Sequence, residues 1–131
     1  MTNEAVLRAY VDAFNAGEWD RMALLFADDA NIRGVLGWGT LDVALPIWRE
    51  LHENMFMRLR VDEVINSDDK SAALLTETGS FNGPFRGLAG IEPTGKPYEI
   101  VAIEWFEFKD GRISRRWAAR DSSAITCQVL A

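Results

Sequence analysis

The chain has 131 residues, of which 48% are hydrophobic and 26% are charged, a composition typical of a globular protein. Its length fits one ordinary domain over residues 1–131. The net charge of −6 would repel a phosphate backbone, so we expect no nucleic-acid partner. A single cysteine, Cys127, and a single histidine, His52, exclude an internal disulfide and the usual zinc sites, and we expect no metal.

The N-terminus is polar and lacks the basic-then-apolar pattern of a secretory signal. No apolar run approaches the roughly 18 residues that span a bilayer. We therefore expect a cytoplasmic protein with no membrane partner.

The first third of the sequence predicts helices. A first helix ends at Gly17 and carries apolar residues at 3.6-residue spacing, namely Val6, Tyr10, Ala13 and Phe14. A second, short helix is predicted over 20–26, and a strand over 30–36 that ends in a glycine cluster. A third helical stripe covers 40–57, and Pro46 favours a start near Leu45 because proline is best tolerated in the first turn.

Beyond residue 58 the hydrophobic period changes from 3.6 to 2. This alternation predicts strands over 59–66, 71–81, 98–109 and 112–121, with a loop over 82–97. Asp110-Gly111 is a strong hairpin signal between the last two strands. Helices followed by an antiparallel sheet indicate an α+β fold, with the helices packed on one face of a curved sheet.

The most informative polar residue in this pattern is Glu104. Strand alternation places it on one face with apolar residues, namely Ile100, Ala102, Phe106 and Phe108. A carboxylate in such surroundings suits a general acid or base. The alternatives are that this face meets solvent or a subunit interface, or that Glu104 forms an ion pair with an arginine.

Three further residues are weaker candidates from spacing alone. Asp121 ends its strand on the side of Ile113 and Trp117, but Asp121-Ser122-Ser123 is also a good helix cap. Arg33 would reach a substrate oxygen, or equally lie at the surface or pair with Glu104. An isolated helix histidine such as His52 is more often packed or exposed than catalytic.

One aromatic residue, Trp38, does not belong to the apolar stripe of any predicted helix or strand. Trp38 lies in the glycine-rich loop and would line the mouth of a pocket for a flat aromatic ligand, or form an oligomer contact. The sequence contains no nucleophile elbow, phosphate-binding loop or dinucleotide fingerprint.

Several segments in order resemble a known superfamily. The residues from Phe14 to Asp20 and from Leu25 to Asp29 resemble the nuclear transport factor 2-like proteins. The segments 83–87, 93–96 and 109–113, with Trp117 four residues before Asp121, are similar to the SnoaL-like polyketide cyclases. The resemblance covers nearly the whole chain.

This resemblance implies a cone-shaped α+β barrel around an apolar cavity. It implies an intramolecular aldol cyclisation of an aromatic polyketide ester, without metal or organic cofactor, in which an aspartate at the position of Asp121 acts as general acid and base. The chain departs from the family where it carries Arg33 and Arg116 in place of histidines, and Glu104 in place of an aspartate.

We therefore predict an enzyme acting on a small hydrophobic, aromatic substrate. Asp121 would move the proton, Glu104 would assist, and Arg33 would stabilise negative charge. The residues expected to contact substrate are Trp38, Trp48, Tyr98, Phe106, His52 and Phe14. The alternatives are an isomerase or hydrolase of another hydrophobic metabolite, or a non-catalytic ligand-binding or assembly module.

Association is also expected. If Glu104 faces the cavity, the opposite face of its strand carries an apolar strip of Val101, Ile103 and Trp105. Such a strip would be exposed in a monomer and would suit a homodimer or higher oligomer.

Overall fold

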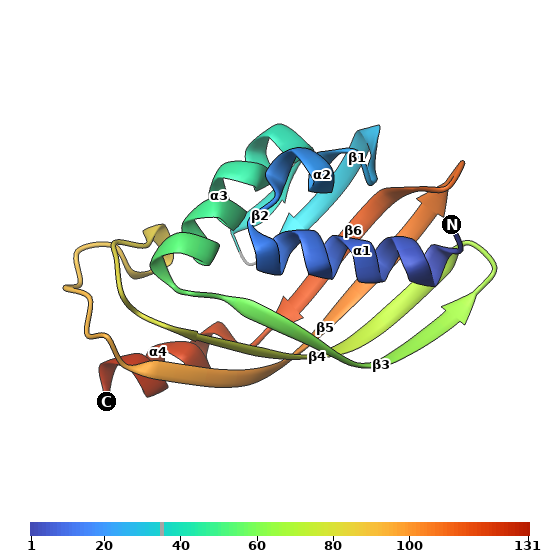
Figure 1. Cartoon of the computed structure of the whole chain (residues 1–131). Helices are drawn as coiled ribbons and strands as arrows, with labels where there is room; N and C mark the ends of the chain where they lie inside the picture. Colours follow the sequence, from blue (N-terminus) through green and yellow to red (C-terminus); the bar gives the residue numbers. More distant parts are fainter. Residues whose placement is uncertain (35) are drawn as a thin grey trace.

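The predicted helices and strands form in the computed structural model, which describes residues 1–34 and 36–131. The helices are α1 (Asn3–Ala16), α2 (Trp19–Ala23), α3 (Leu41–Asn54) and α4 (Ser122–Leu130), with a short 3₁₀ turn η1 (Arg86–Leu88). The strands are β1 (Phe26–Gly34), β2 (Gly37–Gly39), β3 (Arg58–Ser67), β4 (Lys70–Ser80), β5 (Pro97–Lys109) and β6 (Arg112–Arg120). Figure 1 shows α1 and α3 on one side of the sheet, and the α+β prediction is confirmed.

The ends of α1 follow the expected capping chemistry. The hydroxyl of Thr2 accepts a hydrogen bond from the Ala5 amide at 3.1 Å, and Gly17 ends the helix in the left-handed conformation at φ 69°. The third helix begins earlier than predicted, at Leu41, with Pro46 inside it. The proline is tolerated there because it costs the first part of the helix a single i to i−4 hydrogen bond.

The sheet is mixed, where the sequence predicted an antiparallel one. Its strand order is β2-β1-β6-β5-β4-β3, and β1 runs parallel to β6 while the other neighbours are antiparallel. The parallel pairing arises because β1, the first strand in the sequence, lies beside β6, the last. Local alternation does not specify which strands become neighbours. The sheet is curved but not closed into a barrel.

A bulge in the β5–β6 hairpin decides which side chains of β6 face inward. Asp110 and Gly111 adopt positive φ at the turn. Phe108 pairs with Ile113 but Glu107 pairs with Arg115, so one extra residue, Ser114, enters β6. Beyond the bulge Arg116, Ala118 and Arg120 face the helices, and Trp117 faces outward. The predicted sharing of one face by Ile113, Trp117 and Asp121 is therefore wrong.

The core lies between the helices and the inner face of the sheet. Tyr10 and Phe14 of α1 pack there together with Leu75, Phe106 and Ile113 of the strands, all less than 2% exposed. Helix α4 closes one end, where the Gln128 side chain bonds both the amide and the carbonyl of Glu99. Among the described helices, none is both long and apolar enough to cross a membrane.

Candidate functional site

A pocket opens where the inner face of β6 meets α1, α3 and the β1–β2 edge. It contains a cavity of about 60 Å³ and is lined mainly by apolar and aromatic groups, including Tyr10, Phe14, Ile32, Trp38, Ile47, Trp48 and Phe85. Arg116, Ala118 and Arg120 line it from β6. An apolar cavity with a few polar groups is the usual form of a small-molecule site.

A buried polar group stands at the base of this pocket. The guanidinium of Arg116 donates from Nε to Glu104 Oε1 at 2.8 Å, and the Tyr10 hydroxyl donates to the same oxygen at 3.0 Å. Glu104 is fully buried and Arg116 is 3% exposed. The guanidinium also lies over the Trp48 ring, 5.3 Å from its centroid. We call these three residues the Glu104 triad: Tyr10, Glu104 and Arg116.

A second group of the same three residue types lies nearer α4. Arg120 donates from Nε and Nη2 to the two oxygens of Glu77, at 2.6 and 2.5 Å. The Tyr98 hydroxyl donates to Glu77 Oε2 at 2.6 Å. We call this the Glu77 triad: Tyr98, Glu77 and Arg120.

The two triads differ in how fully their carboxylates are bonded. Both oxygens of Glu77 accept hydrogen bonds, as expected of an ion pair that stabilises a fold. In the Glu104 triad both donors bond Oε1, and among the described residues no donor reaches the buried Oε2. A buried acceptor left unpaired is costly, so it either binds a further group or serves a reaction.

Burial and charge fix the protonation of the donors in the Glu104 triad. Burial raises the pKa of the Tyr10 hydroxyl far above its usual value, and the neighbouring Glu104 carboxylate adds to the effect. Burial alone would lower the pKa of Arg116, but Glu104 and Tyr10 together more than offset this and raise it overall. Tyr10 therefore stays a hydrogen-bond donor and Arg116 stays a cation at neutral pH.

The strand register places a small pocket residue opposite Glu104. Its direct partner across β5 and β6 is Ala118, which lines the pocket. Side chains directly opposed on one face lie about 5 Å apart, and here the facing side chain is only a methyl group. Ala118 is thus the pocket residue that stands directly against the buried Glu104 carboxylate.

The aromatic residues predicted to contact substrate separate into two groups. Phe14 and Trp48 line the pocket, and Trp38 lies at its rim, half exposed. Tyr98 and Phe106 are buried outside the described pocket wall, where Tyr98 bonds Glu77 and the Phe106 ring packs 5.4 Å from that of Tyr10. Tyr98 and Phe106 thus support the walls rather than form them.

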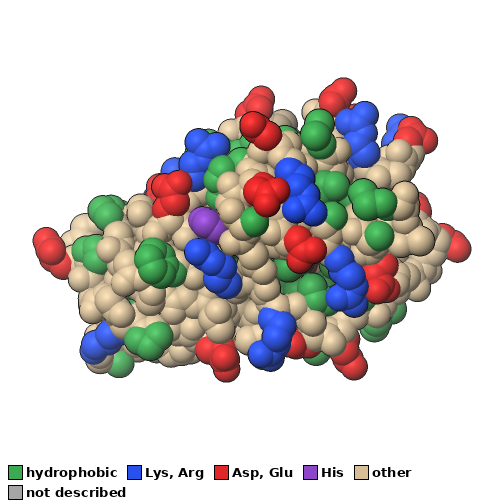
Figure 2. All heavy atoms as spheres, viewed as in Figure 1, with side chains coloured by type: hydrophobic (Ala, Val, Ile, Leu, Met, Phe, Trp, Pro, Cys, Tyr) green, Lys and Arg blue, Asp and Glu red, His purple; other side chains and the backbone are tan. Residues whose placement is uncertain are grey.

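His52 lies where α3 packs against α1 and α2, outside the described pocket wall. Its Nε2 is 3.1 Å from the Asn15 carbonyl oxygen, and its ring packs edge-on against Phe14 and Trp19. Figure 2 shows histidine atoms, in purple, reaching the molecular surface. The geometry supports a packing role and places no substrate contact on this residue.

Arg33 and Asp121 are not brought together with Glu104. Arg33 is exposed on the outer face of the sheet, with its guanidinium 5.1 Å from the centre of the Trp38 ring. Asp121 is exposed and caps α4, its Oδ1 accepting from the Ala124 amide at 2.9 Å. Neither belongs to the described wall of the pocket. Asp121 therefore acts as a helix cap, the alternative role that its sequence context also predicted.

Arg120 and Glu77 were not among the predicted site residues, and Arg116 was noted only as a replacement for a family histidine. Glu77 follows Ser71, Ala73 and Leu75 on the inner face of β4, a pattern like that around Glu104. The alternation in β4 could therefore have pointed to Glu77 as a second carboxylate on an apolar strand face. The inward direction of the arginines depends on the bulge at Ser114, for which the sequence gives no sign.

The described residues contain no group of three or more His, Cys, Asp or Glu side chains placed to hold a metal ion. The polar groups at the described pocket wall are the phenol of Tyr10 and the guanidinium groups of Arg116 and Arg120. Tyr10 and Arg116 in turn bind the buried carboxylate of Glu104.

Comparison with known proteins gives a consistent relationship. A family profile described as SnoaL-like polyketide cyclase matches residues 4–129. IdmH from Streptomyces antibioticus, a candidate polyketide cyclase, is 23% identical with a TM-score of 0.85, and the alignment covers 98% of each chain. A candidate polyketide cyclase from Pseudomonas putida is also 23% identical, with a TM-score of 0.84 and 98% of each chain covered.

The same fold is shared by a protein of different description. AclR from Streptomyces galilaeus, a candidate hydroxylase, is 18% identical with a TM-score of 0.82, over 95% of this chain and 92% of that one. No curated protein matches the chain. At these identities the structural likeness shows the fold, and the reaction must be argued from the pocket.

Proposed function

Since the chain belongs to the SnoaL-like polyketide cyclase family, we propose that it is a cyclase- or isomerase-type enzyme that removes a proton beside a carbonyl group of a flat, hydrophobic substrate. The pocket supplies apolar walls for a ring system. Arg116 binds the carbonyl oxygen and stabilises the negative charge that develops when the proton leaves. The observation that carries the proposal is the buried, unpaired Oε2 of Glu104 beside this arginine.

Glu104 is the proton acceptor in this proposal. Its Oε1 is held by Arg116 and Tyr10, which fixes the carboxylate, while Oε2 is left without a donor in the described part of the chain. A substrate lying over Ala118 would bring its acidic carbon toward Oε2. The carbon needs flanking carbonyl or aromatic groups, because a carboxylate is a weak base for an ordinary carbon acid.

In this proposal Arg116 takes the role that was predicted for Arg33. Its side chain lines the pocket, and only its Nε has a recorded acceptor among the described residues. A guanidinium has five N–H donors, so others remain for a substrate oxygen. Because Glu104 balances its charge, the pocket favours a neutral carbonyl that becomes an enolate over a substrate that is already an anion.

The test is deuterium exchange into a simple ketoester in the presence of matched variants. The methyl ester of 2-naphthoylacetic acid is flat, and its CH₂ lies between two carbonyl groups. We expect the wild-type chain to accelerate exchange in D₂O near pH 6, followed by NMR. Glu104→Gln should lower this acceleration by about 100-fold or more, the usual contribution of a general base, while binding by calorimetry is retained.

Asp121→Asn is the matched control, because it also removes one carboxylate and asparagine still caps a helix. It should leave exchange unchanged. If Asp121→Asn abolished exchange and Glu104→Gln did not, the assignment drawn from family resemblance would replace ours. A wild-type chain that binds the ester and accelerates nothing would favour the ligand-binding module.

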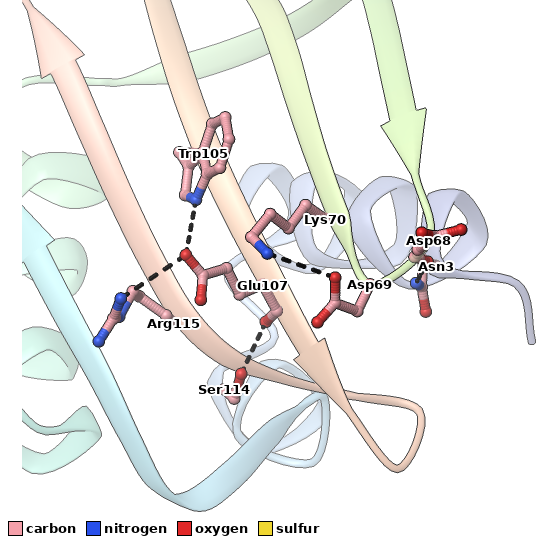
Figure 3. A network of polar contacts seen from close by, with 8 residues as sticks. All are labelled: Asn3, Asp68, Asp69, Lys70, Trp105, Glu107, Ser114 and Arg115. Carbon is pink, nitrogen blue, oxygen red and sulfur yellow. Dashed lines mark hydrogen bonds and ion pairs between the residues drawn. The ribbon is translucent and has the colours of Figure 1, made fainter.

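We propose a homodimer through the outer face of the sheet. Val101, Ile103 and Trp105 are 64%, 52% and 38% exposed there. Figure 3 shows the Trp105 indole and Arg115 both directed at Glu107 on this face.

Light scattering tests this association. We expect a dimer for the wild-type chain and a monomer for Ile103→Glu. The dimer would bury the apolar strip, and a glutamate there would have to lose its hydration. A monomeric wild-type chain at high concentration would contradict the proposal.

A further inference from the structure

A second cavity adjoins the proposed substrate pocket on the far side of Arg120. It has a volume of about 130 Å³ and lies between the end of α3, η1 and α4, with Met55, Leu88, Ile125 and Thr126 among its lining residues. The main pocket and this cavity share Leu36, Leu51, Phe85 and Arg120. The two spaces are therefore neighbours along one wall.

The junction carries a fixed hydrogen-bond donor. Glu77 holds Arg120 through Nε and Nη2, so the guanidinium cannot swing freely. Its Nη1 has no recorded acceptor among the residues that the structure describes. An oxygen of a ligand that crosses from one cavity to the other would pass this group.

Beyond the junction the wall is mainly apolar. Met55, Leu88 and Ile125 are buried side chains, and Gly87 and Ser122 add small residues to the lining. Thr126 offers little polarity, because its hydroxyl already donates to the Ser122 carbonyl at 3.0 Å. A space of this kind takes a short alkyl chain more readily than a charged group.

We infer that the substrate site extends past Arg120 into the cavity under α4, and that the substrate is an aromatic carbonyl compound with an apolar tail attached through an ester or amide. The ring system occupies the main pocket, Arg120 holds the oxygen of the linking group, and the tail occupies the second cavity. This inference rests on the proposed function, because it assumes that the main pocket binds the ring system.

The experiment is a chain-length series on the same probe. Calorimetry would give the Kd of the wild-type chain for the methyl, propyl, butyl and hexyl esters of 2-naphthoylacetic acid. Each methylene that enters the cavity should tighten binding about fourfold, the usual gain for burying one CH₂. The gain should stop once the cavity is filled.

Thr126→Trp fills the second cavity, and Thr126→Val is its control of nearly equal volume. We expect Thr126→Trp to abolish the gain with chain length and to leave the Kd of the methyl ester unchanged, and Thr126→Val to behave as wild type. Circular dichroism checks folding. If Thr126→Trp does not fold, Thr126→Phe and the wild-type series carry the test.

The outcomes distinguish a failure of the second cavity as a subsite from a failure of the proposed function. Binding of the methyl ester with no gain from longer chains, or with a gain that Thr126→Trp leaves intact, would overturn the second cavity as a subsite and leave the proposed function standing. Failure of the wild-type chain to bind even the methyl ester would overturn both.

Discussion

The stability of the chain above pH 10 tests whether both tyrosine hydroxyls are buried and donate hydrogen bonds to carboxylates. The chain has only these two, Tyr10 and Tyr98, which are 1% and 3% exposed. Burial raises the pKa of each hydroxyl well above its ordinary value of about 10, and the facing Glu104 and Glu77 carboxylates add to the effect. Both phenols should therefore stay protonated in the folded chain when an unfolded chain would lose both protons.

The size and sign of the effect follow from proton linkage. Above pH 10 the folded state binds more protons than the unfolded state, so the free energy of unfolding must fall as pH rises. Each tyrosine contributes a slope of about 1.4 kcal/mol per pH unit, and the two together about 2.7 kcal/mol per pH unit. Below pH 10 both states are protonated at these groups and they contribute no slope.

Absorbance near 295 nm, which reports phenolate, measures the ionisation directly. We expect no phenolate signal from the folded chain at pH 11, and a rise from both tyrosines together with the loss of circular dichroism. Tyr98→Phe should halve the slope of stability against pH. A phenolate signal with a midpoint near pH 10 in a chain that keeps its circular dichroism would refute the reasoning.

Three further predictions concern stability, measured by urea unfolding. Arg120→Met should cost about 3–5 kcal/mol, because it leaves Glu77 buried without its cation, and adding Glu77→Met should recover most of that loss; an additive double variant would contradict this. Asp121→Ala should cost about 1 kcal/mol and Asp121→Asn a few tenths, and equal losses would remove the capping role. Gly79→Ala should cost about 1–3 kcal/mol, because a Cβ there would lie 2.3 Å from the Met55 carbonyl oxygen; an unchanged midpoint would show that this approach relaxes easily.

The proposed chemistry depends on the contrast between the triads. They share residue types and burial, yet Glu77 is bonded at both oxygens and Glu104 at one. The Glu77 triad behaves as a structural ion pair that also fixes Arg120 at the junction of two cavities. In the Glu104 triad one oxygen has no donor among residues 1–34 and 36–131, which is the property that a proton acceptor needs.

The elements of the fold were predictable because they depend on local patterns. The 3.6-residue spacing of Val6, Tyr10 and Phe14 predicted α1, and alternation around Glu104 predicted β5 and its inward face. The hairpin at Asp110-Gly111 followed from turn chemistry alone. Each of these signals acts between neighbours in the chain, where the sequence states it directly.

The candidate site was predicted only in part. Glu104 was selected by a charge in an apolar stripe, and it is buried as that pattern requires. Arg33 and Asp121 were drawn from resemblance and from face assignments, and the structure places them at the surface. Phe14 and Trp48 line the pocket because they lie on helix stripes that face the sheet.

By itself the sequence determined the α+β class, the helix and strand periods, and the position of Glu104 on an apolar strand face, since these follow from residues close together in the chain. Only the tertiary structure decided the parallel pairing of β1 with β6, the inward turn of Arg116 and Arg120 after the bulge at Ser114, and the partners of the two buried carboxylates. Those features join residues that are distant in sequence or depend on one inserted residue, and no local pattern specifies either.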